Sequence, residues 1–102
     1  MILIMNNNKN LVSLDELYKI IKIEGLNKYI NSYGYSKKKD KKYYVILKDN
    51  TVIHFGNLNY EDYLLNGSEE KRYRFRSRFR SLYEKNKNNL YSPILWSWRV
   101  LW

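Results

Sequence analysis

The residues in this sequence with the most distinctive chemistry are five arginines at alternate positions between residues 72 and 80. They are Arg72, Arg74, Arg76, Arg78 and Arg80. Only one other arginine, Arg99, occurs in the chain, and lysine is the usual cation elsewhere. A guanidinium group is planar, stays charged and presents a fork of donors that matches phosphate or carboxylate oxygens. The pattern therefore predicts a phosphate-contacting surface, with Lys71 and Tyr73 as neighbouring members.

The alternating spacing of these arginines is compatible with two backbone conformations. In a strand, where side chains alternate between the two faces, all five would share one face. In a helix, Phe75, Phe79, Leu82 and Tyr83 form an apolar stripe. The arginines at positions 72, 76 and 80 then follow one edge of that stripe, and those at 74 and 78 follow the other.

Three local signals favour the helix. Ser68 is a suitable N-cap, and Glu69 and Glu70 suit the positive end of a helix dipole. Glu70 can also pair with Arg74 one turn later. A charge run of this kind is also found on solvated helices whose arginine stems cover apolar surface, so that alternative stays open.

Positive charge is concentrated in the C-terminal part of the chain. The 102 residues carry a formal net charge of +9, and residues 67–102 hold nine cations and three acids, a net +6. A basic excess gathered at one end favours a polyanionic partner. Nucleic acid is the first candidate, with DNA ahead of RNA, and anionic lipid or an acidic protein is the second.

Length and composition narrow the class of protein. A chain of this size suits one domain with a modest core. The absence of cysteine excludes disulfides, thiolate catalysis and zinc–cysteine sites, and it fits a reducing compartment. The apolar start, Met1–Met5, is too short for a signal peptide or a membrane span, and we expect an edge strand there. The protein is therefore expected to be neither secreted nor transmembrane.

An enzyme is difficult to assemble from these residues. His54 is the sole histidine, so no familiar catalytic triad is available, and a structural hydrogen bond is its expected role. The carboxylates occur as neighbours, Glu61–Asp62 and Glu69–Glu70, and neighbouring helical side chains point apart. No glycine-rich phosphate loop or metal-ligand spacing occurs. We expect no catalysis, cofactor or metal, and a metal-dependent nuclease using Asp62 is the weakest alternative.

The N-terminal half predicts helices followed by a lysine run. Ser13 and Glu16 form a capping box for a helix that stops at Gly25. Residues 26–33 predict a second short helix, which ends near Gly34. The lysines that follow are a solvated linker or a secondary basic patch, and the linker is favoured. They are Lys37, Lys38, Lys39, Lys41 and Lys42.

A β-hairpin is the clearest strand signal. Tyr43–Leu47 and Thr51–Phe55 are rich in aromatic and β-branched residues, with turn residues between them. Gly56 permits a sharp exit from the sheet, and Asn59 is a candidate cap for a short turn. The fold class is therefore α+β, with an N-terminal helical segment over 1–36 and a hairpin-plus-helix core over 37–102, in one folding unit. We expect the arginine helix and the C-terminus to cover the hairpin in one core. Its members are Val45, Ile53, Phe55, Phe75, Phe79, Leu82 and Trp98.

The C-terminus is rich in tryptophan. Pro93 suits the first position of a final helix that contains Trp96 and Trp98 and runs to Trp102. A domain this small needs large side chains in its core, so we expect these rings to be buried. If they are exposed, the same three residues predict an interface with a partner.

Six short motifs follow one another in order along residues 41–102. They are K-Y-x-V, I-H-F-G, D-Y, R-Y-x-x-R, S-P-x-x-W-S and L-W. They occupy Lys42–Val45, Ile53–Gly56, Asp62–Tyr63, Arg72–Arg76, Ser92–Ser97 and Leu101–Trp102. This succession resembles a family of small, functionally uncharacterised proteins encoded by large double-stranded DNA viruses of algae and protists. Ser77 stands where the family pattern has a histidine. The resemblance implies a viral context and no particular activity.

Two functions therefore lead. The first is a small, non-catalytic viral protein that binds nucleic acid through phosphate contacts, with a role in genome packaging. The second is a minor structural or cement component of a virion, for which arginines and tryptophans suit an interface. Both place the protein in a virion or in the host cytoplasm or nucleus, and both leave a homo-oligomer open. Nothing indicates a base-specific reader, so any nucleic-acid binding is expected to be weakly selective.

Overall fold

The structure is a computed structural model that describes residues 10–102. The strand expected at Met1–Met5 lies outside the described residues. In chain order, the elements are α1 (Leu14–Ile23), a 3₁₀ turn η2 (Asn27–Tyr29), β1 (Ile30–Tyr35), β2 (Lys41–Leu47), β3 (Val52–Asn57), α2 (Tyr63–Asn66), α3 (Glu69–Asn86), α4 (Pro93–Trp96) and a π-helical segment η3 (Ser97–Leu101). The fold is α+β, as the sequence predicts.

The predicted hairpin supplies two strands of a three-stranded antiparallel sheet, with β2 in the centre and β3 at one edge. The strand order is β1-β2-β3, and Val45 of β2 lies opposite Ile53 of β3. Asn50 adopts a left-handed conformation in the turn, with φ of 74°. Asparagine tolerates that region better than most residues, so the residue at the turn suits the conformation that the β2–β3 pairing requires.

Residues 26–33 do not form the helix that their sequence predicts. Only Asn27–Tyr29 make a single 3₁₀ turn, and the chain then continues as β1. Gly34 is a packing position rather than a helix stop, because a Cβ there would come within 2.7 Å of the Tyr44 hydroxyl. The prediction was wrong because strand pairing depends on a partner elsewhere in the chain, which outweighs the local preference.

Two smaller predictions about the segment after the hairpin also need correction. Gly56 lies inside β3 with φ of +86°, where an added Cβ would come within 2.9 Å of Leu101 and 3.0 Å of Lys42. Its role is therefore close packing rather than an exit from the sheet. Asp62, and not Asn59, caps α2, because its side chain accepts a hydrogen bond from the Leu65 amide at 3.1 Å.

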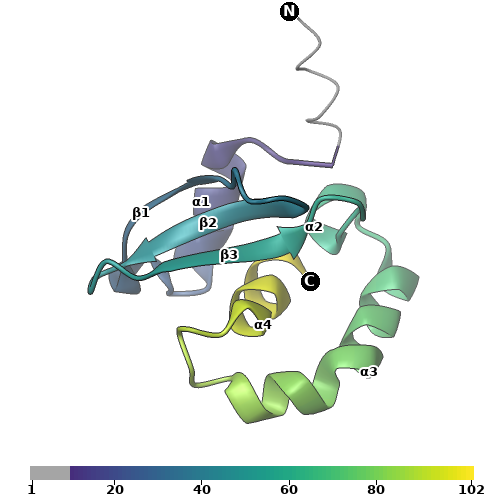
Figure 1. The fold of residues 1–102 in the computed structure, drawn as a ribbon. Coiled ribbons are helices and arrows are strands. Elements are labelled where there is room, and N and C mark those ends of the chain that lie inside the picture. The colour runs from purple at the N-terminus through teal and green to yellow at the C-terminus, as the bar shows by residue number, and fades with distance from the viewer. Residues whose placement is uncertain (1–9) are drawn as a thin grey trace, which may run out of the picture.

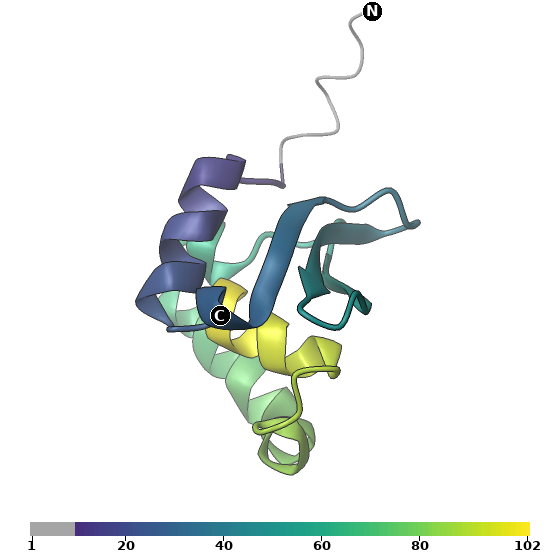
Figure 2. The same cartoon turned by 90° about the vertical axis from the view of Figure 1, so that its left-hand side faces the viewer.

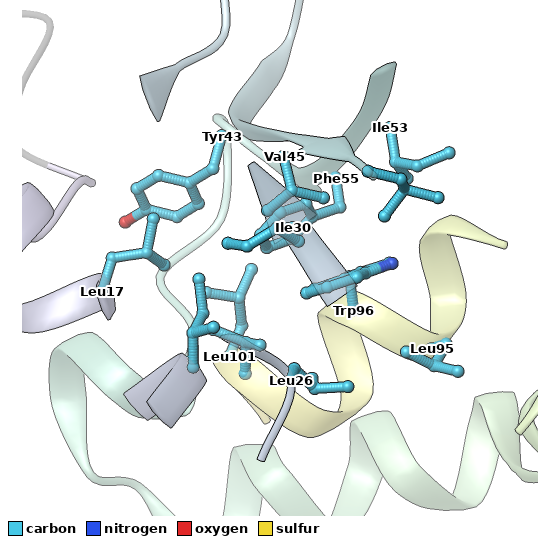
Figure 3. Close-up of a cluster of buried hydrophobic side chains, with 13 residues drawn as sticks. Leu17, Leu26, Ile30, Tyr43, Val45, Ile53, Phe55, Leu95, Trp96 and Leu101 are labelled. Carbon is cyan, nitrogen blue, oxygen red and sulfur yellow. The ribbon is translucent and has the colours of Figure 1, made fainter. Parts of the chain in front are cut away.

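One buried core joins the sheet to α1 and to the C-terminal helices (Figure 3). Leu17 and Ile21 of α1, Val45 and Phe55 of the sheet, and Trp96 of α4 are all fully buried. The predicted Ser13 cap of α1 is confirmed, since the Ser13 hydroxyl accepts a hydrogen bond from the Glu16 amide. The amphipathic face of α1 and the C-terminal segment therefore pack against the same sheet.

The arginine-bearing helix α3 lies outside this core. Figures 1 and 2 show α4 between the sheet and α3, so that α3 forms an outer layer. No residue of α3 is buried, and Leu82 is 47% exposed. The prediction that Phe75, Phe79 and Leu82 share a core with the hairpin was therefore wrong. Trp96 and its neighbours in the C-terminal segment occupy that position instead.

Candidate nucleic-acid interface

The sequence signals at the start of α3 act as predicted. Ser68 accepts a hydrogen bond from the Lys71 amide at 3.2 Å, and Glu70 pairs with Arg74. Gly67, with φ of 63°, ends α2 immediately before this cap. These local contacts help to explain why residues 69–86 form a helix even though none of its residues is fully buried.

One edge of α3 is occupied by contacts within the chain. Arg72 Nε and Arg76 Nη2 both donate to the main-chain oxygen of Trp102, at 2.8 and 3.0 Å. The Arg72 guanidinium also lies 4.6 Å from the ring centre of Tyr63. Arg80 lies 5.8 Å from the ring centre of Trp98. These arginines tie α3 to the C-terminal segment, which is a structural use of their fork of donors.

Arg76 is the most enclosed member of this edge. Its guanidinium lies 4.9 Å from the ring centre of Trp98, and its Nε atom is buried without a hydrogen-bond partner in the described structure. Burial, followed by the nearby charge of Arg72, lowers the pKa of Arg76 below its ordinary value. A side chain held in this way is poorly placed to contact a phosphate group.

An aromatic layer completes the contact between α3 and the C-terminal segment. Phe75 stacks on Trp102 with ring centres 4.5 Å apart, and Tyr83 stacks on Trp98 at 4.2 Å. Stacked pairs of this kind add stability beyond the area that they bury. Phe75 and Tyr83 of the predicted apolar stripe therefore pack on tryptophans rather than on the sheet, whereas Leu82 stays 47% exposed.

The other edge of α3 faces a cleft with a volume of about 630 Å³. The ends of β2 and β3, the loop before α2, α3, and the C-terminal helices surround it, and Figure 1 shows how these elements are arranged. Four cationic side chains with exposed or half-buried positions line it: Lys41, Lys71, Arg74 and Arg78. We call this hollow the basic cleft. It brings Lys41 together with three cations that follow it by 30 to 37 residues in the sequence.

The walls of the basic cleft are largely apolar and aromatic. Phe75, Phe79 and Trp102 contribute rings, and Tyr60 lies among the lining residues with 64% of its surface exposed. The Arg78 guanidinium lies 5.2 Å from the ring centre of Phe79. The cleft therefore combines positive charge with flat apolar surfaces, which are the two properties that nucleic-acid sites combine.

Few carboxylates neutralise the cleft. Lys71 lies 3.7 Å from Glu61, but both side chains are at least half exposed, so that pair is weak. The Arg74–Glu70 pair is also exposed. Arg78 makes no ion pair with a carboxylate of residues 10–102. An anionic partner would therefore meet a surplus of positive charge here.

Lys42 does not belong to a surface patch, which corrects the sequence prediction. It is 1% exposed, and its Nζ lies 2.6 Å from Oδ2 of Asp62. The other oxygen of Asp62 caps α2 through the Leu65 amide, so both carboxylate oxygens have partners. Burial raises the pKa of Asp62, and contact with Lys42 opposes that rise. The pair fastens β2 to the start of α2.

The remaining lysines of the predicted secondary patch lie near the basic cleft. Lys37, Lys38 and Lys39 are exposed in the connection between β1 and β2. Lys41 lies opposite Asn57 in the β2–β3 strand register, and Asn57 also lines the cleft. The Leu58 amide donates a hydrogen bond to the Asp40 carbonyl oxygen. The lysine run is therefore a short exposed connection between β1 and β2, at the same end of the sheet as the cleft.

The tryptophans and Tyr73 have separate positions. Trp96 and Trp98 are buried, so the interface prediction was wrong for both. Trp98 packs against α3 and does not join the core of the sheet, which corrects its predicted place there. Trp102 is half-buried and lines the basic cleft. Tyr73 is 73% exposed but does not line the cleft, whereas Tyr60, which sequence reasoning did not select, does. No local pattern marks Tyr60, because the fold alone places its loop beside α3.

Residues that suggested catalysis have structural contacts. His54 Nδ1 lies 2.8 Å from the Ser36 hydroxyl, as expected of a structural histidine. Within residues 10–102, no three side chains of histidine, cysteine, aspartate or glutamate gather as a metal ion requires. In the same range, no helix combines the length and apolar character needed to cross a membrane.

Comparison with known proteins gives a partial family match. A family described as "Family of unknown function (DUF5754)" matches residues 35–79, and the chain is similar to it over that range. The matched range includes the four cations of the basic cleft and ends before α4 and η3. No curated protein matches the chain. No solved structure matches it either.

Proposed function

We propose that this protein binds nucleic acid without catalysis, by phosphate contacts from the basic cleft. The observation that carries the proposal is the convergence of Lys41 from β2 with Lys71, Arg74 and Arg78 from α3 on one hollow. Side-chain cations on a concave surface attract a polyanion more strongly than the same charges spread over the molecule. The proposal differs from the sequence prediction in giving no phosphate contact to Arg72, Arg76 and Arg80 and no role to Tyr73, none of which lines the cleft.

Binding of this kind is dominated by charge. Phosphate contacts fix the position of a nucleic acid but carry little sequence information. We therefore expect weak sequence selectivity and a strong dependence on salt. A role in packaging a viral genome stays a prediction from the motif resemblance, and it would suit a binder of this type.

The salt dependence of binding tests the proposal. If all four cations of the basic cleft contact phosphates, the plot of log K against log salt should have a slope of about −3 to −4. Replacing Arg74 and Arg78 together with alanine should flatten that slope by about 1.4 to 1.8, because two fewer counterions are released. Fluorescence anisotropy with mixed-sequence duplex and single-stranded oligonucleotides, titrated at several salt concentrations, measures both values.

A charge-matched variant distinguishes binding at the cleft from attraction by the overall positive charge of the protein. Lys19→Ala/Lys28→Ala removes the same charge from exposed positions on α1 and η2, outside the cleft. This variant should keep the wild-type slope nearly unchanged. Equal flattening in both double variants would contradict a specific role for the cleft. An unchanged slope in the arginine variant would point to Lys37–Lys39 instead. No binding at low salt by the folded protein would end the proposal, and the virion-component hypothesis would lead.

A further inference from the structure

The chemistry of the basic cleft also indicates which form of nucleic acid it takes. A ligand held by phosphate contacts alone needs cations on an open surface, and apolar walls would not help it. Here the walls include Phe75, Phe79 and Trp102, and an exposed Tyr60 stands beside them. The part of a nucleic acid that matches such walls is the flat face of an unpaired base.

We propose that the cleft is a site for single-stranded nucleic acid, with one or two bases against its aromatic wall and adjacent phosphates on Arg74 and Arg78. This inference rests on the proposed function and narrows it to one substrate class. The cleft volume of about 630 Å³ lies within the range of pockets that enclose small organic ligands. A duplex keeps its bases stacked inside and could not present them to such a hollow.

The outward face of α3 argues against binding of a duplex by this helix. A helix that enters the major groove presents its cations away from the body of the protein. Residues 70, 73, 77, 81 and 84 are spaced so as to share the outward face, and all are exposed. They are Glu70, Tyr73, Ser77, Ser81 and Glu84, which include two carboxylates and no cation. These five residues of α3 therefore offer a duplex no cation of their own, and both carboxylates already pair with cations, Glu70 with Arg74 and Glu84 with Lys87.

Two further arginines of α3 are already engaged on the edge opposite the cleft, whereas Arg80 and Lys85 are exposed outside it. Arg72 and Arg76 are held by the main-chain oxygen of Trp102 on the opposite edge. Arg74 and Arg78 are spaced one turn apart on the cleft edge, and Arg78 already lies beside the Phe79 ring. A strand that follows this edge would place its phosphates on the arginines and its bases toward the rings.

Two exposed tyrosines provide a matched pair for the test. Tyr60 and Tyr73 are 64% and 73% exposed, so removing either ring should leave folding intact, but only Tyr60 lines the cleft. Tyr60→Ala should lower affinity for single-stranded DNA by about 5- to 140-fold, if its ring stacks on one base. Tyr73→Ala should leave that affinity within about twofold. The measurement is anisotropy with a mixed-sequence 12-nucleotide strand, the equivalent RNA, and a DNA hairpin with the same number of phosphates.

The outcomes separate this inference from the proposed function. Tighter binding of the single strands than of the hairpin, together with a loss of single-strand affinity in Tyr60→Ala but not in Tyr73→Ala, supports the inference. Equal affinity for strand and hairpin, with the salt slope still dependent on Arg74 and Arg78, would overturn the inference while leaving the proposed function intact. Equal effects of the two tyrosine variants would also overturn it. Absence of binding to any of the three probes would overturn both. Circular dichroism checks that each variant is folded.

Discussion

Replacing Lys42 with methionine is expected to lower the free energy of unfolding by about 3 to 5 kcal/mol. Asp62 is only 2% exposed, and its Oδ2 atom lies 2.6 Å from Nζ of Lys42. The change therefore leaves a buried carboxylate without its ionic partner. Removing one member of a buried pair is costly because the remaining charge is neither solvated nor neutralised. Urea denaturation followed by circular dichroism at neutral pH measures the loss. Lys41→Met is the matched control, since that neighbouring lysine is half-buried and makes no such contact.

The same variant should show a defined dependence on pH. Burial raises the pKa of Asp62, and without Lys42 only the backbone amides of Leu65 and Leu64 oppose that rise. An acid whose pKa is higher in the folded state binds more protons when folded, so its cost is fully present above the folded pKa and disappears below the unfolded value. The deficit of Lys42→Met relative to wild type should therefore shrink as the pH falls through the raised pKa.

A second substitution tests whether the effect comes from charge. Lys42→Met/Asp62→Asn removes both charges and keeps a residue that can cap α2. This double variant should be more stable than Lys42→Met alone at neutral pH. A deficit of less than about 1 kcal/mol in Lys42→Met, with no change between pH 4 and 7, would show that the side chains are not a buried pair in solution.

Replacing Trp96 with alanine should also lower the free energy of unfolding by about 3 to 5 kcal/mol, the range for a large buried aromatic residue. Trp96 is fully buried, packs against Phe55 with ring centres 6.0 Å apart, and donates from its indole nitrogen to the Leu90 carbonyl. The substitution removes these contacts and leaves a cavity between α4 and the sheet. Circular dichroism is the appropriate probe during denaturation, since the substitution also alters tryptophan fluorescence.

The half-buried Trp102 provides the comparison for Trp96. Trp102→Ala removes one stacked contact with Phe75 and should cost clearly less than Trp96→Ala. If Trp96→Ala costs less than about 1 kcal/mol, the C-terminal segment is not part of the core in solution. Three tryptophans would then be free to contact another protein, and an assembly role in a virion would gain support.

The alternating arginines of α3 have two different roles in the structure, one on each edge of the helix. The alternating arginines were predicted to form a single phosphate-binding group. On a helix they divide between two edges, and the C-terminal segment covers the edge that carries Arg72 and Arg76. The sequence contains the division into edges, because it follows from helical spacing alone. It does not indicate which edge is covered, because that depends on where residue 102 lies in the fold.

The sequence by itself determined those contacts whose two residues lie close together in the chain. Ser13 and Ser68 cap their helices through amides three residues later, and the hairpin between β2 and β3 needs only a short turn. Such contacts form with little loss of chain entropy, so the residue pattern is sufficient to predict them.

The tertiary structure alone decided the features whose partners are distant. β1 is not far from β2 in the chain, since only the connection 36–40 separates them, but its pairing with β2 still overrides the helical pattern of residues 26–33. Lys42 is buried because Asp62 reaches it across twenty positions, and Tyr60 joins the cleft because its loop lies beside α3. Each of these depends on packing that brings together segments with no local signal for each other, and the free energy of that packing exceeds the local preferences.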